Sequence, residues 1–98
     1  MNIYRNFIET ELTIGLEGRL DTLTAPELEE VLGTALTGAE TLVFDLEKLE
    51  YISSAGLRVL LRAQKVMANR GGMKIVNANE TVMEVFTVTG FDTILTIE

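Results

Sequence analysis

Ser53 and Ser54 are the only two serines of this 98-residue chain, and they are adjacent. They lie between an apolar run, TLVFDL (41–46), and a run with helical spacing, GLRVLLRAQKVM (56–67). A hydroxyl at the start of a helix can accept a hydrogen bond from an early helical N–H group. The same hydroxyl can act as a nucleophile or accept a phosphate. The serine pair is therefore the first candidate for chemistry in this sequence.

Nucleophilic catalysis by these serines requires a base, and the chain has no histidine. Lysine is the remaining candidate base, but no lysine belongs to a recognisable Ser-Lys motif. The stretch ISSAG (52–56) also lacks the first glycine of a G-x-S-x-G nucleophile elbow. Cysteine is absent too, which removes the thiolate nucleophile and the common metal ligands. We expect no enzyme, no metal site and no cofactor.

From the residues alone, capping is the simpler role for a serine at this place. The two hydroxyls can also divide the work, with Ser53 capping the helix and Ser54 free at the surface. Ala55 and Gly56 would then leave a low, flat patch that another protein could approach closely. The positive end of the helix dipole and the unpaired N–H groups make this place favourable for a phosphate.

The elements that would position the serines follow from hydrophobic spacing. A β-hairpin is predicted from 2 to 18, although its turn around Glu9-Thr10-Glu11 lacks glycine and asparagine. A helix is predicted after Thr24, with Thr24 as cap, Pro26 near its start, Glu27 completing a capping box, and an end at Gly38. A strand at 41–46, a helix at 54–69 and a strand at 73–76 follow.

The last quarter of the chain is less regular. Residues 79–90 fit either a helix or a strand, and Asn79 as cap with Gly90 as terminator favours the helix. TILTI (93–97) is predicted as a last strand. Together these elements predict a single α/β domain over residues 1–98, with a mixed sheet of four to five strands and helices packed on it.

Composition limits the partners. With 15 acidic and 8 basic residues the net charge is −7, which disfavours phosphate backbones and anionic lipid surfaces. No apolar run is long enough to cross a bilayer, and the N-terminus has no signal-peptide pattern. We therefore expect a cytoplasmic protein with no nucleic-acid partner and no membrane insertion. The composition does not exclude a protein as the binding partner.

Two motifs, in matching order and spacing, resemble those of a known family. The segment from Leu42 to Ile97, which contains ISSAG, is similar to the STAS domain of bacterial anti-sigma factor antagonists. GRLDTLTAPEL (18–28) is similar to the second signature of that family, a glycine, a hydrophobic residue and an aspartate before the first helix. The resemblance spans nearly the whole chain and implies the STAS fold.

The resemblance also implies a phosphorylation switch. In the family, the unmodified antagonist binds a kinase-type anti-sigma factor, phosphorylation of a serine or threonine releases it, and a phosphatase resets it. The acceptor stands two positions before a helix glycine, which corresponds to Ser54, with Ser53 as the rival. The family's loop aspartate corresponds to Asp21. The residues expected to contact the partner are Asp21, Thr22, Ser53, Ser54, Ala55, Gly56 and Arg58.

One departure from the family pattern leaves alternatives open. The family usually has aspartate before the acceptor and often a hydroxyl residue after it, whereas this chain has Ser53 and Ala55. A second hypothesis is therefore an unphosphorylated STAS interaction subunit of a transporter or a stress-signalling complex. A third is nucleotide binding beside Asp21, although no glycine-rich phosphate loop precedes a helix.

Overall fold

Four strands form one mixed sheet in the order β1-β2-β3-β4 in the computed structural model, which describes all 98 residues. β1 (Asn2–Ile8) and β2 (Glu11–Leu20) are antiparallel and joined by the two residues Glu9 and Thr10. β3 (Thr41–Ile52) and β4 (Met73–Val76) each run parallel to the preceding strand. The predicted hairpin is confirmed, and Glu9 adopts the left-handed backbone conformation that its turn requires (φ 56°).

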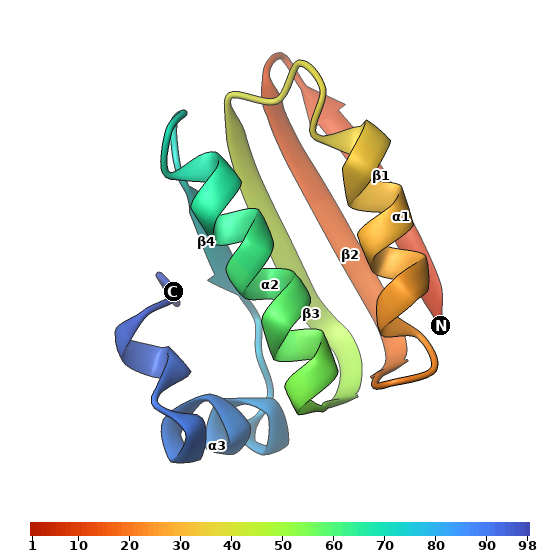
Figure 1. The fold of residues 1–98 in the computed structure, drawn as a ribbon, viewed down its shortest axis with the longest axis vertical. Helices are drawn as coiled ribbons and strands as arrows, with labels where there is room; N and C mark the ends of the chain where they lie inside the picture. The colour runs from red at the N-terminus through yellow and green to blue at the C-terminus, as the bar shows by residue number, and fades with distance from the viewer.

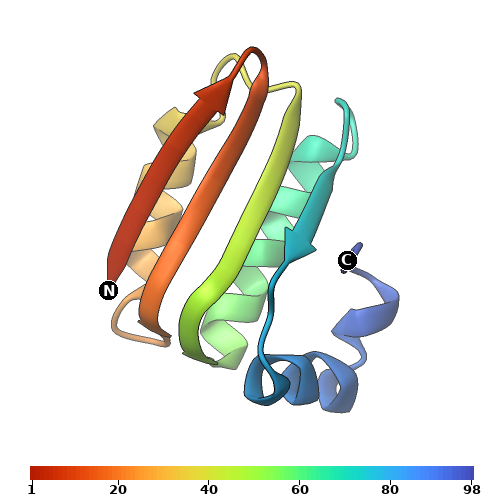
Figure 2. The same cartoon turned by 180° about the vertical axis from the view of Figure 1, so that it is seen from behind.

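Two helices cover one face of the sheet and leave the other uncovered (Figures 1 and 2). α1 (Ala25–Ala35) connects β2 to β3, and α2 (Ser54–Met67) connects β3 to β4. α3 (Glu80–Thr89) lies beyond the end of β4 and packs against β3 (Figure 1). The predicted α/β class and the mixed sheet of four to five strands are confirmed, with four strands observed, and so is the helical alternative for residues 79–90.

The core lies between the sheet and the three helices, and α3 contributes Phe86 to it. Alternate residues of β2 point into it, and one face of each helix closes it. Its largest fully buried side chains are Phe44, Phe86, Leu12, Ile14, Leu16, Leu20, Leu28, Leu42, Leu46, Leu49, Ile52 and Leu60. No polar or charged residue is buried as a whole, so the packing of α2 on the strands is made mainly by apolar contacts.

β3 is twice as long as predicted from its apolar run, because residues 47–52 continue it. Its register against β2 shifts at two points: Gly15 pairs with Asp45 but Glu17 with Lys48, and further along one more residue is inserted. Such bulges bend a strand and break the alternation of side chains. The lost alternation explains why sequence spacing predicted a loop here.

The predicted last strand at 93–97 is wrong. Gly90 ends α3 in the left-handed conformation (φ 80°), and residues Phe91–Thr93 form a 3₁₀ turn. Only Ile97 forms a bridge, to Ile75 of β4. The backbone N–H groups of Ile94 and Leu95 donate to the carbonyl of Phe91 and prolong this turn, so too few extended residues remain for a ladder.

Candidate functional site

The serine pair lies at the carboxyl-end edge of the parallel strands, where β3 meets α2 (Figure 1). Ser53 is extended (φ −101°, ψ 176°) and occupies the N-cap position, and Ser54 is the first helical residue. Ser54 is exposed, whereas the Ser53 hydroxyl oxygen is buried. Of the two rival acceptors, only Ser54 presents its side chain to solvent.

The expected cap by Ser53 is wrong in one respect. Ser53 holds the N-cap position, but its hydroxyl makes no hydrogen bond to the helix and has no partner elsewhere. Its backbone N–H instead donates to the carbonyl of Leu20 at 2.9 Å. This bond extends the pairing of β2 with β3 by one step and fixes the loop after β2 beside the start of α2.

Asp21 and Thr22 follow Leu20 directly, so the loop aspartate and the serines lie on adjacent segments of the same edge. The Asp21 carboxylate accepts from the backbone N–H groups of Leu23 (3.0 Å) and Thr24 (3.2 Å). In return, the Thr24 hydroxyl accepts from the Asp21 N–H at 2.9 Å. The side chain of each of these two residues thus accepts a hydrogen bond from the backbone N–H of the other, as in a capping box.

This arrangement corrects the prediction for the first helix. Thr24 holds the N-cap position of α1, but its side chain makes no bond to that helix. Its hydroxyl donates to the carbonyl of Arg19 at 2.8 Å and ties the loop back to β2. Asp21 and Thr24 therefore stabilise the turn before α1 rather than its first helical N–H groups.

Asp21 is held in its ionised form. Partial burial alone would raise its pKa, but the hydrogen bonds from Thr24 and Leu23 and the nearby Arg19 outweigh that effect and lower the pKa below 3.8. The Arg19 guanidinium lies 3.8 Å from the Asp21 carboxylate and over the ring of Tyr51, 4.5 Å from its centroid. A fixed negative charge therefore lies next to the serines at neutral pH.

The lowered pKa predicts how stability depends on pH. A carboxyl whose pKa falls on folding stabilises the folded state above its unfolded pKa, and this contribution disappears as the pH drops through the folded pKa. We expect Asp21→Asn to lose less stability than the wild type between pH 7 and pH 3, because the amide does not titrate. Urea unfolding at both pH values measures the difference.

Asp92→Asn is the matched control, because the Asp92 side chain lies in the 3₁₀ turn and makes no ion pair. Equal acid sensitivity of wild type and Asp21→Asn would show that the loop bonds contribute nothing to pH dependence.

Gly56 was expected to form part of an open, flat patch, and this expectation is wrong. Gly56 is buried and faces the strands. A Cβ atom there would lie 2.7 Å from Cγ of Leu20 and 2.9 Å from Cγ1 of Ile52. The glycine therefore lets the first turn of α2 approach the ends of β2 and β3, and so sets the height at which Ser54 is presented.

The other predicted contact residues lie at or near the surface. Thr22 and Arg58 are exposed and Ala55 is half-buried. Sequence reasoning missed Leu23, which is 89% exposed at the tip of the loop after Asp21. The signal was a leucine within the polar stretch DTLTAP, a place where no helical or strand face could bury it. An exposed apolar side chain on the loop adjacent to the serine segment suits contact with another protein.

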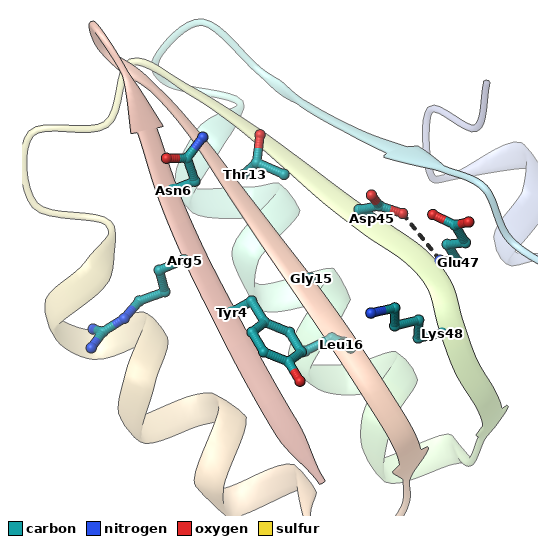
Figure 3. Close-up of a pocket in the computed structure, with 9 residues that line it drawn as sticks. All are labelled: Tyr4, Arg5, Asn6, Thr13, Gly15, Leu16, Asp45, Glu47 and Lys48. Atoms are coloured by element: carbon teal, nitrogen blue, oxygen red, sulfur yellow. Dashed lines mark hydrogen bonds between the residues drawn. The ribbon is translucent and has the colours of Figure 1, made fainter.

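A shallow depression of about 300 Å³ lies on the uncovered face of the sheet (Figure 3). Tyr4 lies along it, and its hydroxyl donates to Glu17 at 2.7 Å. That bond raises the pKa of Tyr4, while bonds from Asn2 and Tyr4 lower the pKa of Glu17. The Lys48 ammonium lies 5.8 Å from the Tyr4 ring centroid. These groups bond to one another, and the depression is on a different face from the serine edge.

The serine edge suits recognition by a protein. No group of three side chains that could hold a metal ion is present. No helix combines the length and apolar character needed to cross a membrane. What the edge offers is an exposed hydroxyl, a fixed carboxylate and an exposed leucine on neighbouring segments.

Comparison with known proteins agrees with this architecture. The model of the family described as "Mlab, STAS domain" matches residues 6–96. BtrV of Bordetella bronchiseptica is 36% identical over 93 residues, covering 93% of this chain and 80% of that protein. The anti-sigma-B factor antagonist of Bacillus subtilis is 29% identical over 90 residues, covering 91% of this chain and 83% of its own length.

Solved structures share the fold. The anti-sigma factor antagonist SpoIIAA in its unphosphorylated form superposes with a TM-score of 0.83 at 20% identity, covering 99% of this chain and 88% of its own. Its phosphorylated form, from Bacillus, gives 0.75 at 19% identity, with 99% and 91% covered. Together with the family match and the BtrV identity, these findings establish that the chain belongs to the STAS domain family that includes the anti-sigma factor antagonists.

Proposed function

We propose that this protein is an anti-sigma factor antagonist whose binding to a kinase-type anti-sigma factor is switched off by phosphorylation of Ser54. The main observation that supports this proposal is that Ser54 is exposed at the first position of α2, whereas the Ser53 hydroxyl is buried. The names of the Bacillus relative and of SpoIIAA, which is described in phosphorylated and unphosphorylated forms, support the same function. A serine phosphatase would restore the binding form.

The physics of the switch follows from where the phosphate would sit. It adds about −1.5 to −2 charges at neutral pH. At the N-terminus of α2 the helix dipole favours a negative charge, so the fold should survive the modification. Asp21 already provides a negative charge on the neighbouring loop, and the phosphate would add to it. The Asp21 carboxylate and the phosphate together would carry about −2.5 to −3 charges, against −1 from Asp21 alone in the unmodified chain.

Incubation with the cognate anti-sigma kinase and ATP tests the proposal. We expect one phosphate per chain, located on Ser54 by mass spectrometry, and none on a Ser54→Ala variant. Ser53→Ala should be phosphorylated at a rate close to wild type, because its hydroxyl points away from solvent. Phosphate on Ser53, or on a threonine outside this edge, would contradict the assignment.

A second candidate is a STAS interaction subunit that works without phosphorylation, in a transporter or a stress-signalling complex. The observation that favours it is Ser53, which replaces the acidic residue that commonly precedes the acceptor in the family. The kinase would then lose a recognition charge. In that case the chain stays unmodified in the assay above, and ATP leaves its complex with the partner intact.

A further inference from the structure

Arg58 is an exposed cation near the start of α2, and the structure gives it no partner. The ion pairs join Arg19 to Asp21, Arg62 to Glu29 and Lys74 to Glu98. The first turn of α2 carries no acidic residue. A cation near the N-terminus of a helix is disfavoured by the helix dipole, so Arg58 gains nothing from its own helix.

The spacing places Arg58 over Ser54. Residues four apart on a helix lie on the same face, with Cβ atoms about 5–6 Å apart. Long side chains on a helix lean toward its N-terminus and cover the preceding turn. An Arg58 side chain in this usual orientation reaches a group attached to the Ser54 hydroxyl. Arg62, two turns from Ser54, is already bonded to Glu29 of α1.

We propose that Arg58 is an intramolecular clamp for a phosphate on Ser54. The inference rests on the proposed phosphorylation and adds how the modified state is built. A guanidinium presents paired N–H donors that match two oxygens of a phosphate. In the unmodified chain the same guanidinium is free to bond an acidic group of the partner. Phosphorylation thus adds a negative charge at Ser54 and also makes the Arg58 guanidinium unavailable to the partner.

The charged groups on the adjacent segments are the same in all the variants below. Asp21 on the loop after β2 opposes the dianion, and Arg19 is bonded to Asp21. Tyr51, near the end of β3, lies under the Arg19 guanidinium. Arg58 is thus the cation left free to pair with a phosphate on Ser54.

The test is a ³¹P NMR titration of a chain with phosphoserine inserted at position 54 during synthesis. The second pKa of a phosphoserine is about 6. We expect it to rise by roughly half a unit in Arg58→Gln relative to the unchanged background, the size of an exposed ion pair. Arg58→Lys should fall between the two, because an ammonium keeps the charge but loses the paired donors.

Arg62→Gln is the matched control, since it removes one arginine from the same helix two turns from the phosphate. Its phosphoserine pKa should stay within error of the background. The same pKa in the Arg58→Gln chain as in the background, or an equal rise in Arg62→Gln, would overturn the clamp. Because the phosphate is inserted without a kinase, the clamp can fail while Ser54 remains a kinase substrate, and the reverse also holds.

Discussion

Replacing Ser54 with aspartate is expected to weaken binding to the anti-sigma factor by about 30-fold or more while leaving the fold intact. Bringing a charge into a surface that must be desolvated on binding costs about 2 kcal/mol or more, which corresponds to that factor. Asp21 on the adjacent loop adds like-charge repulsion. The fold should survive because an acidic residue in the first turn of α2 interacts favourably with the helix dipole.

Calorimetric titration against the purified anti-sigma factor measures the affinity, and circular dichroism with urea unfolding measures the fold. Ser54→Ala should bind close to wild type, which separates the added charge from the lost hydroxyl. Thr81→Asp is the matched control, because Thr81 is an exposed residue in the first turn of α3. It introduces the same charge at another helix start and should leave binding unchanged.

Two results would count against the switch. Unfolding of Ser54→Asp would mean that lost binding reflects lost structure rather than charge at an interface. Unchanged affinity in a folded Ser54→Asp chain would place the partner surface elsewhere, for example on the uncovered face of the sheet around Tyr4 and Lys48. The second result would favour the interaction subunit without phosphorylation.

Sequence spacing predicted the parts of this fold that are regular. The apolar residues of β2 alternate, and those of α1 and α2 recur at helical spacing, so that each element has one apolar face. These faces pack on a common core, which is why the spacing predicts which residues are buried. The second half of β3 does not follow any period, since its bulges bring both Leu46 and Leu49 inward. Where a bulge forms depends on how a strand pairs with its neighbour, and the spacing of residues within one strand does not contain that information.

Sequence reasoning named candidate residues, but it could not tell how their side chains are bonded or which of them face solvent. The serine pair was identified from its residue type and its position between a predicted strand and a predicted helix, and Asp21 from its match to the family's motif. Whether Ser53 or Ser54 faces solvent depends on the extended backbone at Ser53 and on its bond to Leu20, both set by the sheet. Likewise, the exchange of bonds between Asp21 and Thr24 depends on the loop conformation.

Gly56→Ala is expected to destabilise the protein by about 1–3 kcal/mol, the usual cost of overpacking a core. The added methyl would lie 2.7 Å from Cγ of Leu20 and 2.9 Å from Cγ1 of Ile52, and both of these side chains are fully buried. Ordinarily, alanine stabilises a helix relative to glycine by up to about 1 kcal/mol. The steric cost at Gly56 must therefore exceed that gain, and urea unfolding measures the balance.

Gly33→Ala in α1 is the matched control, because nothing lies within 4 Å of the Cβ it would add. It should be neutral or stabilising, so the two helical glycines are expected to respond with opposite signs. Equal responses would mean that the first turn of α2 moves outward without cost. In that event Gly56 would not set the position of Ser54. If the methyl is costly, the first turn of α2 relieves the clash by shifting away from β2 and β3, and Ser54 shifts with it. Gly56→Ala should then also weaken binding to the anti-sigma factor, although Gly56 itself is buried and does not contact the partner.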